Sequence, residues 1–254
     1  MCGITGVAWN AGQSPLDMSV LEPMTTVLAH RGPDDCGYYR STDQEDAPGG
    51  SPPGAALGHR RLSIIDLGGG HQPLSNEDGT VWIAFNGEIY NYRELQADLE
   101  KRGHTFRTSS DTEAIVHLYE EYGPDCVLHL RGMFAFAIWD DRNKQLLLAR
   151  DRLGQKPLVY RQEPGRLLFA SELKSLLQVP GLPREIDPVA LYEYLTYQYV
   201  PAPRCMLAGF HKLLPGHTAL YRDGELTIRR YWEPGYDAGE MQVAGLNFSK
   251  PDNP

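Results

Sequence analysis

The chain has 254 residues, enough to bury a full hydrophobic core in one large domain or in a domain with a smaller lobe. Its formal net charge of −9 argues against a surface for nucleic acid or an anionic membrane, because such surfaces need clustered lysine and arginine. No apolar run is long enough to cross a bilayer, and we expect no secretory signal at the start. Cys2, Cys36, Cys126 and Cys205 are widely scattered and form no metal-binding motif, so we expect free thiols, no structural zinc and a cytoplasmic location.

Cys2 would unite two reactive groups in one residue if the initiator methionine were removed. Its thiol would be the nucleophile, and its α-amine, which titrates near pH ~8, would be the base. This is the arrangement of an N-terminal nucleophile, where the amine takes the place of the histidine in a Ser-His or Cys-His pair. The alternative is an inert cysteine after the start codon. An expected strand at Gly3–Trp9 favours the nucleophile, because it would hold Cys2 in place.

A helix is expected over residues 17–29, where apolar side chains recur at helical spacing, with Pro23 in its first turn or at a break. Residues 30–35, His-Arg-Gly-Pro-Asp-Asp, indicate a turn. The residues alone leave open whether this turn is a charged surface loop or part of a site. After a polar excursion over residues 41–54, a strand with two arginines inside it is expected at 56–66.

A buried strand is expected at residues 81–85, directly before an Asn-Gly-Glu sequence at 86–88. An Asn-Gly step after a strand is typical of a hairpin turn. The residues that follow suit a helix instead, with Asn91 as its N-cap and Gly103 as its stop. Because the hairpin then lacks a second strand, a functional role for the Asn-Gly step is favoured.

A capping box is expected at residues 110–113, Ser-Asp-Thr-Glu, at the start of a helix that ends near Tyr122. In that position Asp111 would stabilise the helix dipole whatever other role it has. The remaining expected elements are a hairpin of strands 133–139 and 145–150, a strand at 166–170, helices at 171–177 and 187–197, and a hairpin of strands 218–221 and 226–231.

Five motifs follow one another along the chain: residues 1–6 (Met-Cys-Gly-Ile-Thr-Gly), 30–35 (His-Arg-Gly-Pro-Asp-Asp), 61–66 (Arg-Leu-Ser-Ile-Ile-Asp), 85–91 (Phe-Asn-Gly-Glu-Ile-Tyr-Asn) and 110–113 (Ser-Asp-Thr-Glu). Together with residues 150–158 (Arg-Asp-Arg-Leu-Gly-Gln-Lys-Pro-Leu), they resemble the glutaminase domain of glutamine-hydrolysing asparagine synthetases. That domain is a class II glutamine amidotransferase and an N-terminal nucleophile hydrolase.

The resemblance implies an α+β fold, the four-layer αββα sandwich of N-terminal nucleophile hydrolases, with a short C-terminal partial lobe. Residues 1–180 would form the glutaminase domain, and residues 181–236 resemble the start of a synthetase domain. Residues 237–254 have little periodicity and are expected to be a disordered tail.

The resemblance also implies a catalytic and a substrate-binding group of residues, and no metal. Catalysis would rest on Cys2 as the nucleophile and on Asn86 and Gly87 as donors to the oxyanion. Binding would use a guanidinium for the α-carboxylate, two acids for the α-ammonium, and neighbours that line the pocket. These binding residues are Arg61, Leu62, Ile64, Asn86, Gly87, Glu88 and Asp111.

By the same resemblance, the chain would hydrolyse L-glutamine to glutamate and ammonia through a thioester, without a cofactor. ATP and magnesium would be needed only in a synthetase domain, and the Ser-Gly-Gly-x-Asp-Ser loop that marks such a domain does not occur in this sequence. A separate synthetase subunit is therefore the expected acceptor of the ammonia. Two alternatives stay open: a truncated, uncoupled product, and a non-catalytic module that binds glutamine.

Overall fold

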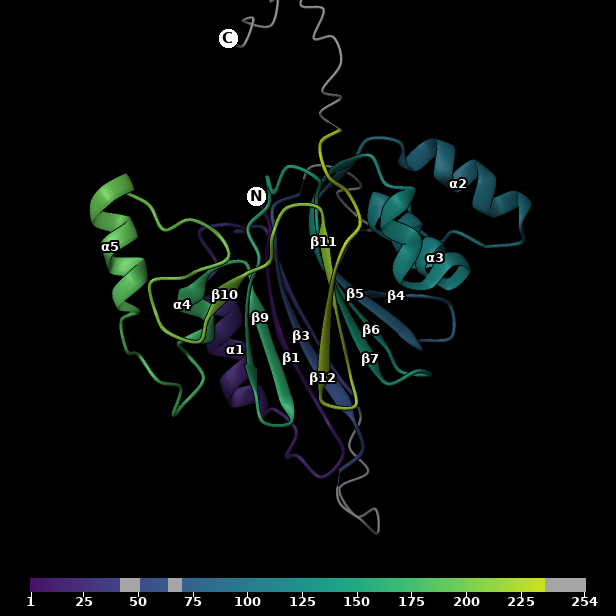
Figure 1. Cartoon of the computed structure of the whole chain (residues 1–254). Coiled ribbons are helices and arrows are strands. Elements are labelled where there is room, and N and C mark those ends of the chain that lie inside the picture. The colour runs from purple at the N-terminus through teal and green to yellow at the C-terminus, as the bar shows by residue number, and fades with distance from the viewer. Residues whose placement is uncertain (42–50, 64–69, 236–254) are drawn as a thin grey trace, which may run out of the picture.

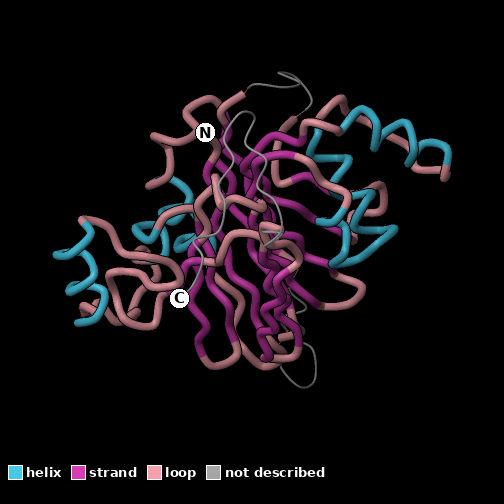
Figure 2. The backbone as a smooth tube through the Cα atoms, turned by 45° about the horizontal axis from the view of Figure 1, so that its top comes forward, coloured by secondary structure: helices cyan, strands magenta, loops and turns pink. Residues whose placement is uncertain are grey.

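The structure is a computed structural model that describes residues 1–41, 51–63 and 70–235. In these residues, two antiparallel β-sheets lie face to face between groups of helices (Figure 1). Figure 2 shows the strands gathered in the middle of the molecule, with helices on either side. This arrangement is the four-layer αββα sandwich that the resemblance implies.

Each sheet has six strands in the described part of the chain. In spatial order, the first sheet contains β10 (His211–Lys212), β8 (Val159–Glu163), β9 (Arg166–Ala170), β1 (Gly3–Trp9), β3 (Gly54–Arg61) and β2 (Asp35–Arg40). The second contains β12 (Glu225–Arg230), β11 (His217–Arg222), β7 (Gln145–Arg150), β6 (Gly132–Asp140), β5 (Val81–Ile89) and β4 (Leu74–Ser75). The N-terminal strand β1 is thus an inner strand, fixed on both sides by its neighbours β9 and β3.

Helices cover the outer face of each sheet. On the first sheet these are α1 (Met18–Thr26) and α4 (Leu173–Leu176), and on the second α3 (Asp111–Tyr122), with α2 (Tyr92–Lys101) against it (Figure 1). A 3₁₀ helix, η1 (Gly123–Leu128), follows α3. Apolar clusters fill both helix-sheet interfaces, and a third cluster fills the space between the two sheets. Within the described ranges, no helix has both the length and the apolar character needed to span a bilayer.

Helix α5 (Pro188–Tyr197) lies apart from the sandwich (Figure 1). It begins as the sequence predicts, because the Asp187 side chain accepts hydrogen bonds from the main-chain nitrogens of Val189 and Ala190, at 2.8 and 3.2 Å. Ala190 is the one buried residue of the helix, while Tyr192 and Leu195 are 72% and 74% exposed. The helix therefore presents a large apolar surface.

Several elements differ from the local patterns of the sequence, among them the strand expected at 56–66, which is β3 and ends at Arg61. The strand expected at 81–85 continues as β5 to Ile89, because residues 86–88 pair with residues 133–135 of β6, so the Asn-Gly step lies inside a strand. Helix α1 is shorter than the expected 17–29, and Pro23 lies inside it, beyond the first turn. Edge strand β2 and strand β8 have no clear alternation of apolar residues, and the sequence analysis misses both.

The expected cap at Asn91 is wrong, although α2 begins directly after it. Its side chain makes no capping hydrogen bond. Instead, Asn91 Nδ2 donates to the main-chain oxygen of His129 at 3.0 Å, and its Oδ1 accepts from the nitrogen of Arg131 at 2.9 Å. A long-range partner has replaced the local one. The expected cap at Ser110 is confirmed, since its side chain accepts a hydrogen bond from the nitrogen of Thr112. The expected capping box is incomplete, because Glu113 accepts from the nitrogens of Arg107 and Thr108 and the Ser110 nitrogen donates to Thr108 Oγ1 instead.

Residues from the predicted second domain, 181–236, contribute to both sheets. Strand β10 pairs with β8 in the first sheet, and the β11–β12 hairpin pairs with β7 in the second. The boundary near residue 180 stays a prediction from sequence. The expected tail at 237–254 lies outside the described residues.

Candidate active site

Alternation along β1 and β3 directs two predicted site residues into the space between the sheets. Ile4 of β1 and Leu57 of β3 both belong to the apolar cluster in that space. Because side chains alternate with a period of two along a strand, Cys2 and Arg61 lie on the same side of the first sheet as these residues. Both stand at the same end of the sheet, because Gly3 of β1 pairs with Arg60 of β3.

Strand β5 supplies the opposite wall from the second sheet. Ala84 belongs to the same cluster between the sheets, so Asn86 and Glu88 share its side of the strand. The Asn86 side chain is buried, at 1% exposure, and its Nδ2 has no hydrogen-bond partner within the described part of the chain. A buried amide with an unused donor has a strong tendency to bind an acceptor brought by a ligand.

One pocket opens at this end of the sandwich. Six predicted site residues line it: Cys2, Arg61, Leu62, Gly87, Glu88 and Asp111. They come from the ends of β1 and β3, from β5 and from the start of α3, so four separate segments of the chain supply a single site. The seventh, Asn86, lies between two lining residues of β5, and the eighth, Ile64, lies outside the described residues.

The Cys2 thiol is held by the residue that follows Arg61. The main-chain nitrogen of Leu62 donates to Cys2 Sγ at 3.4 Å, and Sγ lies 3.7 Å from the Leu62 oxygen. Burial raises the pKa of the thiol, while the Leu62 N–H, the charged N-terminus and Arg61 act in the opposite direction. Since the net shift is upward, the thiol is protonated at neutral pH and needs a base to become a nucleophile.

The main chain of Cys2 is anchored independently of its thiol. Arg31 Nε donates to the Cys2 carbonyl oxygen at 2.9 Å, and Arg31 Nη1 donates to Glu172 Oε1 at 2.8 Å. The following strand residue, Ile4, donates its N–H to Ser171 Oγ at 3.0 Å. The chain beside Cys2 is therefore fixed, whereas the preceding Met1 is 55% exposed.

Gly87 is required by the packing of two strands. A Cβ at this position would overlap the main-chain oxygen of Met133 and lie 2.8 Å from the Cα of Phe134, both on β6. Only glycine therefore lets β5 approach β6 this closely while the same residue lines the pocket.

Two carboxylates, Glu88 and Asp111, lie close together on the pocket wall. Asp111 is 4% exposed, and its Oδ2 accepts a hydrogen bond from the main-chain nitrogen of Ile89 at 2.8 Å. Burial raises the pKa of both carboxyls, and the charge of Asp111 adds to the rise for Glu88, which Lys156 opposes. A cationic group bound between them would relieve this cost of placing two like charges together.

Gln72 links two parts of the pocket wall through hydrogen bonds, and no sequence pattern predicts it. Its Oε1 accepts a hydrogen bond from the nitrogen of Phe85 at 2.7 Å, and its Nε2 donates to Thr112 Oγ1 at 3.2 Å. Gln72 thus joins the segment before β4 to β5 and to α3. Gly70 and Ser110 also line the pocket. A single glutamine before a proline carries no pattern, so the sequence alone offers no signal for it.

The sequence profile of the family described as "Glutamine amidotransferase domain" matches residues 1–232, nearly the whole chain. The chain belongs to the class II glutamine amidotransferases. This domain is 42% identical to asparagine synthetase [glutamine-hydrolyzing] 1 of Bacillus subtilis over 243 residues, which cover 93% of the chain and 36% of that protein. It is 43% identical to asparagine synthetase [glutamine-hydrolyzing] 2 of rice (Oryza sativa subsp. japonica) over 177 residues, or 69% of the chain and 28% of the rice protein. The amidotransferase domain thus spans about a third of the length of such relatives.

Two solved structures share the fold of this amidotransferase domain. One is an allosteric regulatory enzyme of purine biosynthesis, with a TM-score of 0.64 and 22% identity. The other is the glutamine phosphoribosylpyrophosphate amidotransferase of B. subtilis, with a TM-score of 0.61 and 22% identity. Each match covers 92% of this chain and 50% of the other. At this identity the similarity establishes the layered fold alone.

Proposed function

We propose that this domain hydrolyses L-glutamine to glutamate and ammonia, with Cys2 as the nucleophile after removal of Met1. The observation that carries the proposal is the convergence of a thiol, a guanidinium and two carboxylates on one pocket. Arg61 would bind the α-carboxylate of glutamine with its planar fork of donors. Glu88 and Asp111 would bind the α-ammonium, which supplies the positive charge that their raised pKa values favour.

The two binding groups of opposite charge, Arg61 on one side and Glu88 with Asp111 on the other, also define the substrate class. A peptide or a simple amide lacks one or both of the charged groups that these residues bind, and would leave a buried charge unpaired. A free amino acid satisfies both. Its side chain would then extend toward the Cys2 thiol, so a side-chain carboxamide is the group that reacts.

The proposed reaction has two covalent steps. In the first, the freed α-amine of Cys2 takes the thiol proton, Sγ bonds to the carboxamide carbon, and the carbon–nitrogen bond breaks as the leaving nitrogen gains that proton and departs as ammonia. In the second, water attacks the thioester, the carbon–sulfur bond breaks, and the sulfur regains a proton while glutamate leaves. No cofactor takes part in this proposal.

The oxyanion of each tetrahedral intermediate needs hydrogen-bond donors. We assign this role to Asn86 Nδ2, because it is buried, lies between two pocket-lining residues of β5 and uses no partner within the described residues. Gly87, next to it on β5, lines the pocket and would offer its main-chain N–H. One such donor typically stabilises the transition state by about 2.7–4 kcal/mol.

The proposed acceptor of the ammonia is a synthetase region like that of the asparagine synthetases, with ATP and magnesium acting there. The exposed apolar side chains of α5 support this part of the proposal, since an apolar surface of this kind fits against another protein surface. Tyr192, Leu195 and Tyr197 are the most exposed apolar residues of that helix.

The test is release of ammonia and glutamate from glutamine by three proteins. The unaltered domain is expected to release both products in equal amounts, and Cys2→Ala is expected to release neither. Cys36→Ala is the matched control, because Cys36 lies on β2, contacts Tyr38 and does not line the pocket. Its activity is expected to be unchanged. Glutamine binding without turnover by the unaltered domain would instead support a non-catalytic binding module.

A further inference from the structure

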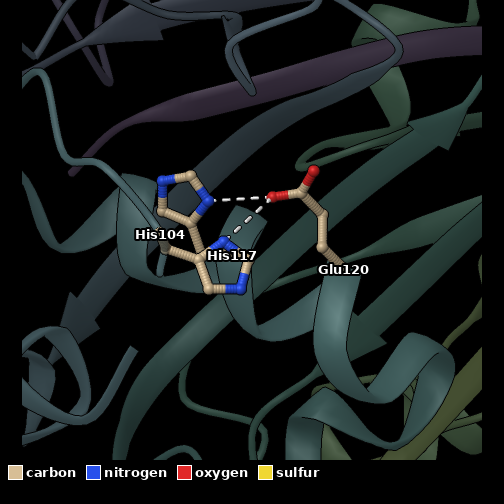
Figure 3. A group of neighbouring side chains, drawn as sticks. All are labelled: His104, His117 and Glu120. Atoms are coloured by element: carbon tan, nitrogen blue, oxygen red, sulfur yellow. Dashed lines mark hydrogen bonds and ion pairs between the residues drawn. The ribbon is translucent and has the colours of Figure 1, made fainter. Parts of the chain in front are cut away.

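A second group of reactive side chains lies near the far end of α3, away from the active-site pocket. His104, in the segment before α3, meets His117 and Glu120 of the helix (Figure 3). One potential ligand atom from each residue lies within 4.8 Å of the other two. With a rise of about 1.5 Å per residue, the two helical members lie roughly 9–14 Å along α3 from Asp111. We propose that His104, His117 and Glu120 bind a divalent transition-metal ion, with zinc as the best fit.

The first histidine has its ring orientation set by a neighbouring acid. His104 Nε2 lies 3.0 Å from Glu121 Oε1, a distance at which the ring donates a hydrogen bond. With the proton on Nε2, Nδ1, which lies 3.7 Å from Glu120 Oε2, would offer its lone pair to an ion between them (Figure 3). Metal-binding histidines commonly donate their second ring N–H to a carboxylate in this way.

The second histidine is wholly buried, and its ring repeats the same arrangement. His117 Nδ1 lies 2.8 Å from Glu120 Oε2, so both histidines direct Nδ1 at the same oxygen (Figure 3). His117 Nε2 lies 3.8 Å from Glu113 Oε1, within ion-pair distance, and has no hydrogen-bond partner in the described part of the chain. Glu113 itself is held by the main-chain nitrogens of Arg107 and Thr108, at 2.8 and 2.7 Å.

The carboxylate ligand is oriented as well. Asn76 Nδ2 donates to Glu120 Oε1 at 2.8 Å, which leaves Oε2 to face the two imidazoles. Two of the proposed ligands thus have their other polar atom hydrogen-bonded, His104 to Glu121 and Glu120 to Asn76. The third, His117, has Glu113 at ion-pair distance from its Nε2. An accidental meeting of polar side chains does not require this second layer, whereas a metal site does.

The spacing and the charge of the cluster suit a zinc ion. Ligands at about 2.0–2.2 Å from a tetrahedral zinc lie roughly 3.3–3.6 Å from one another. The two contacts to Glu120 Oε2, at 2.8 and 3.7 Å, bracket this separation. Three acids, Glu113, Glu120 and Glu121, surround the two imidazoles and favour a cation between them. A metal ion would replace the proton that His117 now shares with Glu120.

Partial exposure of Glu120 would let water reach the fourth position of the ion. The Glu120 side chain is 17% exposed and also lines a second surface pocket, next to Val81 and Arg142. Two histidines and one carboxylate with an open position form a ligand set found in zinc sites. The bound ion would tie the segment before α3 to the helix whose first residue, Asp111, lines the active-site pocket. The inference does not depend on the proposed glutaminase reaction.

The test is titration of chelator-treated protein with ZnCl₂, followed by calorimetry, and with CoCl₂, followed by its visible absorption. The unaltered protein is expected to bind one ion, and His104→Ala is expected to lose it. His104 is partly exposed, so this variant should fold. Glu121→Ala removes the hydrogen-bond partner of His104 and an exposed ion pair with Arg102, and is expected to weaken metal binding by about 10- to 100-fold. His129→Ala removes an exposed histidine that stacks on Tyr122 outside the cluster, and is expected to bind normally.

A thiol also binds zinc, so the titration is repeated with Cys2→Ala. Binding is expected to persist in this variant. The inference is overturned if the unaltered protein binds no ion, if His104→Ala binds zinc as tightly as the unaltered protein, or if the ion is lost in Cys2→Ala. The first of these outcomes would leave the cluster as a buried ion pair between an imidazolium and its acids.

Discussion

Cys2 Sγ accepts a hydrogen bond from the main-chain nitrogen of Leu62, at 3.4 Å. This contact joins the residue before β1 to the residue after β3, and it places the thiol beside Arg61, the guanidinium that would bind the substrate. The proposed nucleophile, Cys2, and the proposed carboxylate-binding residue, Arg61, are thus positioned by two adjacent strands of one sheet, which pair along seven residues of β1. The geometry of the site depends on that pairing.

Asp111→Asn is expected to separate binding from stability. The amide retains an oxygen for the N–H of Ile89 but loses the charge that would meet the α-ammonium. A hydrogen bond to a charged group contributes about 1.5–3 kcal/mol, so KM for glutamine should rise roughly 10- to 150-fold. Because burial raises the pKa of Asp111, the ionised acid costs stability at neutral pH, and the melting temperature should hold or increase. A sharp fall in the melting temperature with KM unchanged would mean that Asp111 serves only the helix.

Asn86→Ala is expected to impair catalysis much more than folding. Its Nδ2 has no partner among the described residues, so its removal breaks no hydrogen bond of the free protein. As an oxyanion donor it would contribute to kcat by about 10²- to 10³-fold. Steady-state kinetics and thermal unfolding of the same preparation test this directly. Unchanged kcat would remove Asn86 from the proposed mechanism.

Gly87→Ala is expected to destabilise the protein by about 1–3 kcal/mol, the usual cost of overpacking. The new methyl group would collide with the main chain of Met133 and Phe134 and force β5 away from β6. Urea unfolding gives the difference in free energy. Gly235→Ala is the control, because a Cβ there has no atom within 4 Å in the described structure. Equal stability of the two variants would contradict the close approach of the strands.

The cluster on α3 should give the metal-free protein a pH-dependent stability. Burial alone would lower the pKa of His117, but Glu113 and Glu120 outweigh it and raise the pKa to about 9. His117 therefore stabilises the fold fully below its unfolded pKa of about 6.5, and loses this effect as the pH rises through about 9. The free energy of unfolding, measured with a chelator, should fall between pH 7 and pH 9, and His117→Gln should flatten that decline.

Below neutral pH, the dependence of the free energy of unfolding on pH comes from Glu113. Burial would raise its pKa, but the ion-pair contact with His117 and the hydrogen bonds from Thr108 and Arg107 lower it to about 2. Its contribution is present above the unfolded pKa of about 4.3 and is lost as the pH falls toward 2. For the alkaline range, a free energy of unfolding that did not change between pH 7 and pH 9 in the unaltered protein would contradict the ion pair of His117 with Glu113 and Glu120.

Sequence motifs predict the residues that meet at the pocket better than local patterns predict the elements that carry them. Cys2, Glu88 and Asp111 are found through their motifs, and the structure brings all three to one pocket. Capping at Ser110 and Asp187 is also predicted correctly, because a cap depends on neighbours two or three residues away. Their catalytic and binding roles remain proposals.

Features that depend on distant partners escape the sequence analysis. Asn91 resembles a helix cap, yet its side chain binds the main chain near residue 130, forty positions away. Strand β5 extends past its apolar run because β6 lies beside it, and Gln72 gains its place from contacts with β5 and α3. His104 and His117 are thirteen residues apart, so their meeting follows only from the packing of α3 against the segment before it.

The central claim is that Cys2 is a free N-terminal nucleophile in a glutamine pocket. Intact-mass measurement, before and after treatment with an electrophilic glutamine analogue, tests it most directly. The account predicts that Met1 is absent, that one adduct forms on Cys2, and that an excess of glutamine protects against labelling. Retention of Met1, or an adduct that still forms in Cys2→Ala, would contradict the account.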